Sequence, residues 1–231
     1  MAARPLRLLL ACLCAAGAAI ALAAPPTTTR VERSGDAIVF TGRIDADSAQ
    51  RFLALLDEPG VRRLVITSGG GLVAPALDMA EALQAHGLDL EVPRQCRSSC
   101  ANYLFPAARH KTLGWPGAVA WHGTMAHVLH LAQTGKASWG EAQLAEARVL
   151  ARREAALYER LGVDGLLGWF AKLPPYDVPD FYFLSPQDLE RFGVRDVVVR
   201  DGAAPAGALD DLQAVQVDWP ALQAHRPTGV P

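Results

Sequence analysis

A serine and a histidine 24 positions apart are the residues of this sequence best suited to covalent chemistry. Ser98 follows an expected strand and begins an expected helix, and His122 ends a further strand expected over 118–123. A serine hydroxyl becomes a nucleophile when a histidine takes its proton. A helix N-terminus, with its dipole and free N–H groups, favours the negative oxygen that develops during acyl transfer. The pair therefore predicts Ser98 as nucleophile and His122 as general base. A histidine with a structural role in an apolar strand is the alternative.

Three consecutive glycines can supply the oxyanion hole of such a site. Gly69, Gly70 and Gly71 follow a nearly continuous apolar run over 63–68, which is typical of a buried strand. Glycine lets backbone N–H groups come close to a substrate. We expect the N–H groups of Gly70 or Gly71 and of Ser99 to hold the oxyanion. A tight turn without a catalytic role is the alternative for the glycines.

Two cysteines, Cys96 and Cys100, flank the pair of serines. Residues four apart in a helix lie about 6 Å apart at Cα, within reach of a disulfide. A loop this short adds only about 2 kcal/mol in the chain-entropy model, so global stability is a poor reason for a bridge. Local rigidity at Ser98 is a better one. Two buried free thiols are the alternative.

The first 23 residues have the pattern of a secretory signal peptide that ends at Ala23. Two arginines precede an apolar run, and the run ends at a small-x-small cleavage sequence. The run is shorter than the ~20 residues that a membrane-spanning helix needs. Secretion into an oxidising compartment allows Cys96 and Cys100 to pair. A lipid-anchored form is the alternative, although the residues before Cys12 match a lipoprotein signal poorly.

Composition favours one globular domain and gives no reason to expect a nucleic-acid partner. Removing the signal leaves about 208 residues and moves the formal charge from −2 to about −4. Phosphate binding draws on clustered Lys and Arg, which a mildly acidic, Ala- and Leu-rich chain does not offer. A chain of this length can bury a substantial core. We divide it into a linker at 24–36, the domain at 37–200 and a partly disordered C-terminal tail at 201–231.

Strand and helix signals alternate along the domain. Strands are expected over 37–42, 63–68, 88–93 and 118–123. Helices are expected from Asp45 or Asp47 to Pro59 and over 73–86, where Gly87 ends the second helix. This order is typical of an α/β domain with mostly parallel strands.

A long helix is expected in the second half, from Trp139 to Leu161. Ser138 and Glu141 have the spacing of a capping box at its start. Its apolar residues form one stripe at helical spacing, namely Leu144, Ala147, Leu150 or Ala151, Leu157 and Leu161. The stripe can pack on the domain's own core or pair with another subunit.

Three segments together resemble the superfamily of the Clp protease proteolytic subunit and crotonase, in particular its secreted bacterial relatives. The segments are ITSGGGLVAPALDMAEAL, CRSSCANYLFPAARHKTLGWPGAVAWHG and FLSPQDLERFGVRDVV. The resemblance spans roughly 38–199. It implies a crotonase-like (ClpP-like) repeated β-β-α spiral with mostly parallel strands, as a single domain plus a helical insertion. It also places Ser98 and His122 in the protease's catalytic positions, and implies a periplasmic location and a homo-oligomer.

The third catalytic residue of the family is an aspartate just before the last of these segments. Strict alignment places Phe181 there, with Asp180 one position away and Asp177 also near. No Asp or Glu occurs over 93–139, so a carboxylate that orients His122 must come from elsewhere in the chain. We take Asp180 as that residue, because an imidazole without such a partner has no fixed tautomer.

These features predict a secreted serine hydrolase or peptidase that transfers an acyl group to water, with no cofactor, no metal and no ATPase partner. The substrate can be a peptide, an acyl ester or another amide. A catalytically inactive binding or assembly module of the same fold is the main alternative. A metal site at His122, His127 and His130 is another, but no nearby acid completes a ligand set. Acyl-coenzyme A chemistry is not expected outside the cytoplasm.

Overall fold

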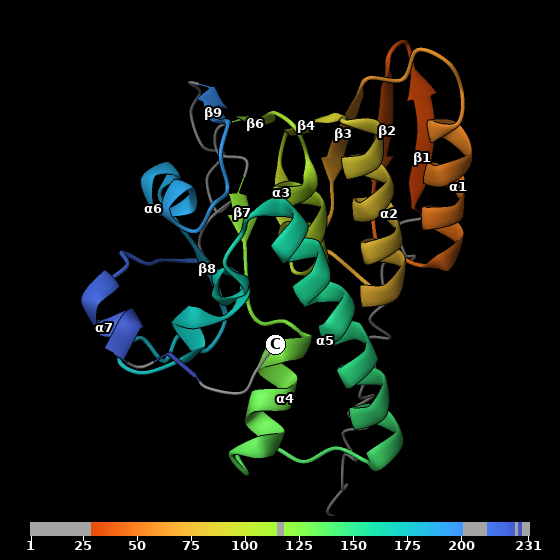
Figure 1. The fold of residues 1–231 in the computed structure, drawn as a ribbon. Helices are drawn as coiled ribbons and strands as arrows, with labels where there is room; N and C mark the ends of the chain where they lie inside the picture. The colour runs from red at the N-terminus through yellow and green to blue at the C-terminus, as the bar shows by residue number, and fades with distance from the viewer. Residues whose placement is uncertain (1–28, 115–117, 201–211, 225, 228–231) are drawn as a thin grey trace, which may run out of the picture.

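The structure is a computed structural model that describes residues 29–114, 118–200, 212–224 and 226–227. The predicted signal peptide at 1–23 lies outside these residues. A twisted sheet forms the back of the view in Figure 1, and helices α1, α2 and α5 lie in front of it. A smaller layer of strands, which includes β7 and β8, lies beside this sheet.

The main sheet has six strands in the order β1-β2-β3-β4-β6-β9. Neighbouring strands are parallel except for β1 and β2, which form an antiparallel hairpin. The strands are β1 (Arg30–Ser34), β2 (Ala37–Thr41), β3 (Arg63–Thr67), β4 (Asp89–Val92), β6 (Lys111–Gly114) and β9 (Val197–Arg200). The predicted α/β domain with mostly parallel strands is confirmed.

Local sequence explains where the first helices begin and end. Helix α1 (Ala46–Leu56) begins after Asp45, whose carboxylate accepts from the Ser48 N–H, while the Ser48 hydroxyl accepts from the Asp45 N–H. This reciprocal pair satisfies two donors that a helix start leaves open. Helix α2 (Val73–His86) ends at Gly87, which has a φ of +61°. Glycine adopts this left-handed conformation without strain, so the predicted end of α2 is confirmed.

The smaller layer of strands carries the candidate site. Its strands are β5 (Gln95–Arg97), β7 (Ala118–Ala120), β8 (Phe181–Phe183) and β10 (Leu212–Ala214). Strand β5 is parallel to β7, and β8 is parallel to β10. Single bridges extend the layer, from Ser68 to Cys96 and from Trp121 to Tyr182. Strands β3, β4 and β6 of the main sheet are each followed along the chain by a segment of this layer.

Helix α5 (Glu141–Leu161) packs on other elements of the same domain. It lies beside α2 and α4 (Met125–Gln133), and its first half extends with α4 beyond the sheet (Figure 1). Ala147 and Ala151 pack against α4, and Leu157 lies in the main core. The predicted apolar stripe therefore contacts the domain itself. None of the described helices is long and apolar enough to cross a membrane.

The start of α5 differs from the prediction. Gly140, and not Ser138, is the residue that precedes the first helical turn. Its N–H donates to Oε1 of Gln143 at 3.0 Å. The predicted capping box of Ser138 and Glu141 is wrong because Gln143 is the side chain that reaches back to the helix start.

The remaining helical segments are short. They are α3 (Phe105–Ala107), α6 (Pro186–Arg191), α7 (Trp219–Ala224), the π-helical segment η1 (Cys100–Leu104) and the 3₁₀ segments η2 (Gly165–Gly168) and η3 (Phe170–Lys172). Segment η1 runs directly into α3, so the chain after Ser98 is helical up to Ala107. This agrees with the predicted helix start at the serines.

The domain extends beyond the predicted 37–200 at both ends. Strand β1 lies in the segment that was expected to be a linker, and its backbone pairs with β2. Strand β10 and helix α7 lie in the segment that was expected to be a partly disordered tail, yet Val215, Val217 and Leu222 are buried. Short elements held by distant partners have too little periodicity for a sequence pattern to show them. The tail residues 201–211 lie outside the described part of the chain.

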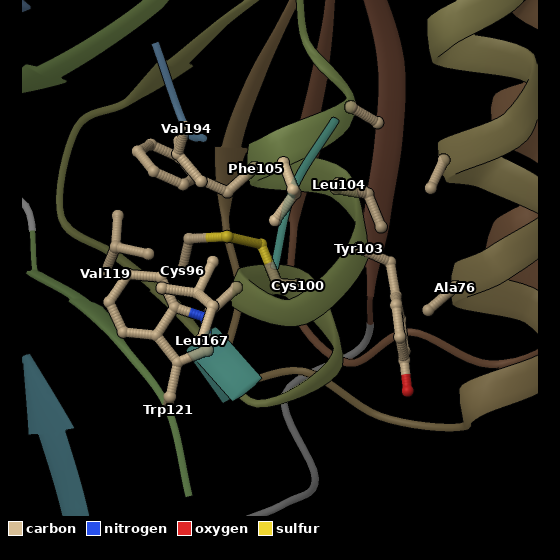
Figure 2. Close-up of a cluster of buried hydrophobic side chains, with 14 of the residues drawn as sticks. Ala76, Cys96, Cys100, Tyr103, Leu104, Phe105, Val119, Trp121, Leu167 and Val194 are labelled. Atoms are coloured by element: carbon tan, nitrogen blue, oxygen red, sulfur yellow. A yellow bond between two sulfur atoms is a disulfide. The ribbon is translucent and has the colours of Figure 1, made fainter. Parts of the chain in front are cut away.

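The hydrophobic core continues under the small layer of strands. Cys96 and Cys100 form a disulfide, as the sequence predicts for an oxidising compartment. Figure 2 shows this bridge among Phe105, Val119 and Trp121, all of which are buried. The turn that contains Ser98 is therefore attached to the core by a covalent link.

Candidate active site

Ser98 and His122 meet at one edge of the small layer of strands. Oγ of Ser98 lies 2.7 Å from Nε2 of His122. Ser98 directly follows β5, and His122 comes two residues after β7. The two strands are parallel, so their carboxyl ends lie at the same edge, and the Ser98 N–H donates to the Ala120 carbonyl at 3.0 Å. A hydroxyl and an imidazole in hydrogen-bond contact are the arrangement that nucleophile and base require.

The backbone at Ser98 turns sharply. Its φ is +55°, in the left-handed region that strains a residue other than glycine by about 1–2 kcal/mol. The Ser98 carbonyl accepts from the Asn102 N–H at 2.8 Å. The Cys96–Cys100 bridge spans the same turn, with 5.3 Å between the two Cα atoms. The bridge and this hydrogen bond hold a strained turn of the kind that accumulates at functional sites.

Gly70 lies directly against this turn. Its φ is +90°, and a Cβ at this position would lie 2.7 Å from both the Arg97 carbonyl oxygen and Ser98 Cβ. Any side chain would displace the backbone that carries Ser98, so glycine is required here. This close approach is the geometry that an oxyanion hole at the glycine run needs.

The predicted oxyanion donors differ in what they bind. The Gly70 N–H donates to Oγ of Ser68 at 3.0 Å, and the Gly71 N–H donates to Oγ of Ser99 at 2.8 Å. No hydrogen bond within the described residues uses the Ser99 N–H. The Ser99 N–H thus has no acceptor among the described residues, although Ser99 is buried, whereas a glycine donor must exchange a serine hydroxyl for the oxyanion.

An aromatic ring and a lysine surround His122. The Phe181 ring centroid lies 4.5 Å from that of the imidazole, and the guanidinium of Arg97 lies 5.7 Å from the same Phe181 ring. Burial lowers the pKa of His122, and the nearby ammonium of Lys172 lowers it further. A lower pKa favours the neutral imidazole, the form that accepts a proton.

The predicted third residue, Asp180, does not contact His122. Nζ of Lys172 donates to the carbonyls of Val178, Pro179 and Asp180 at 2.9, 2.9 and 2.5 Å. In the described part of the chain, neither a hydrogen bond nor an ion pair joins the Asp180 carboxylate to the imidazole. Phe181 is the residue that packs on the imidazole ring instead. The structure brings Ser98 and His122 together and offers no contact that supports Asp180 in the third role.

The two other histidines near the site pack on one indole. The rings of His127 and His130 lie 5.4 and 5.2 Å from the ring of Trp169. Burial lowers the pKa of His127 to about 4, with a smaller effect from Lys172. Among the described residues, no group of three or more His, Cys, Asp or Glu side chains is placed to hold a metal ion. Packing on Trp169 accounts for both histidines.

Three residues that the sequence analysis missed contact the candidate site or its supporting segments. They are Asn102, Glu154 and Lys172. Glu154 is a buried carboxylate on the apolar face of α5, between Ala151 and Leu157, and that position is a signal that the sequence does contain. Asn102 and Lys172 give no such signal, because their partners include backbone carbonyls that only the fold brings near.

Comparisons with known proteins identify no family. No protein-family model matches the chain, and no curated protein matches it. Among solved structures, the chain is similar to an enoyl-CoA hydratase from Mycobacterium avium subsp. paratuberculosis K-10, with 14% identity and a TM-score of 0.30. The match covers 40% of this chain and 49% of that chain, so it spans about half the length of that enzyme. A likeness at this level carries no argument about the fold or about the site.

Proposed function

We propose that the protein is a secreted serine hydrolase that uses Ser98 and His122 for acyl transfer to water. The 2.7 Å contact between Ser98 Oγ and His122 Nε2 is the observation that supports this most strongly. It joins two residues that follow different strands, and Ser98 lies on a strained turn beside a glycine run. A chance contact between surface side chains would not require a strained turn or a glycine run beside it.

The mechanism follows from the atoms at the site. Ser98 Oγ attacks the acyl carbonyl carbon while Nε2 of His122 accepts its proton. The developing oxyanion accepts from the Ser99 N–H and from Gly70 or Gly71, each donor being worth roughly 3 kcal/mol. The imidazolium then protonates the leaving group, and a water that His122 deprotonates releases the acyl group. A peptide, an ester or another amide fits this sequence of steps.

The finer fold assignment is part of this proposal. Each of β3, β4 and β6 is followed by a segment of the small layer, at Ser68, β5 and β7. Repetition of a main-sheet strand, a small-layer strand and a helix supports the β-β-α spiral of crotonase-like proteins. Helices α4 and α5 are then the helical insertion after the histidine.

The disulfide supports export, because such bridges persist in oxidising compartments. A periplasmic location and a homo-oligomer without an ATPase partner complete the proposal. The main competing function is an inactive binding or assembly module of the same fold. The contact of His122 with Phe181, where a triad has a carboxylate, is the observation that favours the module.

Labelling with a fluorophosphonate probe separates the two functions. The exported protein should take up one label at Ser98, located by peptide mass spectrometry. Ser98→Ala should take up none while its circular dichroism spectrum stays that of the wild type. A folded protein with its disulfide formed but no label would refute the hydrolase and favour the module.

A further inference from the structure

Asn102 joins the two halves of the candidate site. Its N–H donates to the Ser98 carbonyl at 2.8 Å, and its side-chain Nδ2 donates to the Gly123 carbonyl at 2.9 Å. Gly123 directly follows His122. The side chain is buried, so few alternative partners compete for its donors. One residue thus binds the backbone at the nucleophile and the backbone next to the base.

Glu154 holds the segment after His122 from the other side. Its Oε2 accepts from the Met125 N–H at 2.9 Å. The carboxylate also accepts from the Thr124 side chain and the Ala126 N–H. Glu154 is only 2% exposed, and a buried carboxyl group without such partners would be strongly unfavourable. The start of α4 is therefore fixed to α5.

The same helix also binds Asn102. The hydroxyl of Tyr158, one turn after Glu154, donates to the Asn102 carbonyl at 3.0 Å. Gly168 in η2 packs against the group, since a Cβ there would lie 2.3 Å from Cγ2 of Thr124 and 3.1 Å from Oδ1 of Asn102. Helix α5 and segment η2 leave the segments of Ser98 and His122 little room to move apart.

We propose that Asn102 and Glu154 are positioning residues that hold His122 at Ser98, in place of a carboxylate on the imidazole. In a triad, the third residue orients the histidine through its ring. Here the orientation is imposed through the backbone on the C-terminal side of His122, at Gly123 and at residues 124–126. The expected effect on the labelling rate rests on the proposed hydrolase function, whereas the expected effect on the His122 titration does not.

Asn102→Leu tests the link to Gly123. The variant removes the Nδ2 donor and keeps a similar side-chain volume. The backbone N–H of residue 102 still donates to the Ser98 carbonyl. We expect the rate of fluorophosphonate labelling to fall about 100-fold, because a shift of about 1 Å in catalytic geometry can have this effect. In an NMR titration of ¹⁵N-histidine protein, the pKa of His122 should rise toward its ordinary value as the ring leaves its desolvated place.

A pair of variants at Glu154 tests the second link. Glu154→Gln keeps an oxygen that accepts from the Met125 N–H and should keep most of the labelling rate. Glu154→Leu removes the acceptor and should slow labelling by about tenfold or more. Rescue by the conservative variant separates positioning from a simple loss of stability.

Ser48→Ala is the control for destabilisation. It removes a buried hydroxyl at the start of α1 that accepts from the Asp45 N–H, far along the chain from the site. It should lower the melting temperature without changing the labelling rate or the His122 titration. Wild-type rates and an unshifted His122 in both Asn102→Leu and Glu154→Leu would overturn the proposal. If Asn102→Leu does not fold, the Glu154 pair decides. If the wild type takes no label, the hydrolase proposal fails and the NMR titration alone decides the positioning role.

Discussion

The ring of Phe181 packs on the ring of His122, with 4.5 Å between their centroids, where the sequence resemblance places a third catalytic carboxylate. Among the described residues, the charge that lowers the pKa of His122 is the ammonium of Lys172. In the proposed hydrolase, the site is therefore a dyad whose histidine is held by packing and by its backbone. A substitution at position 181 therefore tests whether a carboxylate beside His122 increases the reactivity of the site.

Phe181→Asp should convert the dyad into a triad. A carboxylate beside the imidazole favours its charged form, so the pKa of His122 should rise, and a fixed tautomer should speed fluorophosphonate labelling about tenfold. An NMR titration and the labelling rate measure the two effects. Phe181→Leu separates the loss of the aromatic ring from the gain of a charge. An unchanged His122 pKa in Phe181→Asp would show that position 181 does not act on the imidazole.

The two adjacent serines should respond very differently to alanine. Ser98→Ala should abolish labelling with little change in thermal stability, because its hydroxyl contacts His122 at the surface of the site. Ser99→Ala should retain labelling and lose about 1 kcal/mol of stability, since the Gly71 N–H loses its acceptor. His122→Ala should match Ser98→Ala, because groups that act as a unit are not additive. A loss confined to Ser99→Ala would assign the nucleophile to the neighbouring serine.

Removing the disulfide should affect activity more than stability. The double variant Cys96→Ala, Cys100→Ala should lower the melting temperature by about 4–8 °C, since a short loop is worth about 2 kcal/mol. Labelling of Ser98 should slow about tenfold, because relief of about 1–2 kcal/mol of strain at its left-handed φ favours another turn. Labelling at the wild-type rate would contradict a role for the bridge in holding Ser98. In the native exported protein, neither thiol should react with an alkylating reagent.

The contact between Ser98 and His122 could be predicted from the sequence, because both residues follow short parallel strands. Helix α2 was equally clear, because the glycine run and Gly87 mark its two ends. Strand β6 was missed because its buried Lys111 looks like a surface residue. Only the fold shows that the Lys111 ammonium donates to the carbonyls of Ala108 and Arg195.

The sequence could not identify the third residue of the site, for a related reason. Asp180 and Phe181 are neighbours at the start of β8, and neighbouring side chains of an extended segment point to opposite sides. Only one of them can face His122, and an alignment that is uncertain by one residue cannot choose between them. Asn102 and Glu154 act through backbone groups, which no pattern of side chains shows.

The stability of the protein should fall as the pH rises through neutrality because of Glu154. Burial raises the pKa of Glu154 to about 8, from an ordinary value of 4.5. Between these values the folded protein binds a proton that the unfolded chain does not. The free energy of unfolding therefore decreases with rising pH, by up to about 1.4 kcal/mol per pH unit.

Thermal unfolding of wild type and Glu154→Gln at pH 7 and pH 8 measures this dependence. The wild-type melting temperature should drop by about 2–4 °C per kcal/mol lost. The variant should show no drop and a slight rise, because burial lowers the pKa of Lys111 from 10.5 to about 8 and stability gained from this group increases with pH. His127 does not interfere, because its pKa is lowered from 6.5 to about 4 and its effect is complete above pH 6.5. Equal slopes in the two proteins would contradict a proton on Glu154.

The last prediction concerns assembly. An oligomer interface on α5 must lie on a face of the helix other than the apolar stripe. Leu157 is 0% exposed in the main core, so Leu157→Glu should unfold the domain rather than dissociate an oligomer. Val149 is 50% exposed on the outer face of the same helix. Light scattering of the mature protein should give a multiple of about 22 kDa, the mass of one chain of this length.

The matching variant is Val149→Glu, which places a charge on the outer face without disturbing the core. It should reduce the mass to that of one chain while the circular dichroism spectrum and the labelling of Ser98 stay unchanged. Val149→Ala is the control, because it removes apolar area without adding a charge and should weaken the oligomer only partly. A wild-type protein that is monomeric at micromolar concentration ends the assembly prediction, and an oligomer that survives Val149→Glu moves the interface away from α5.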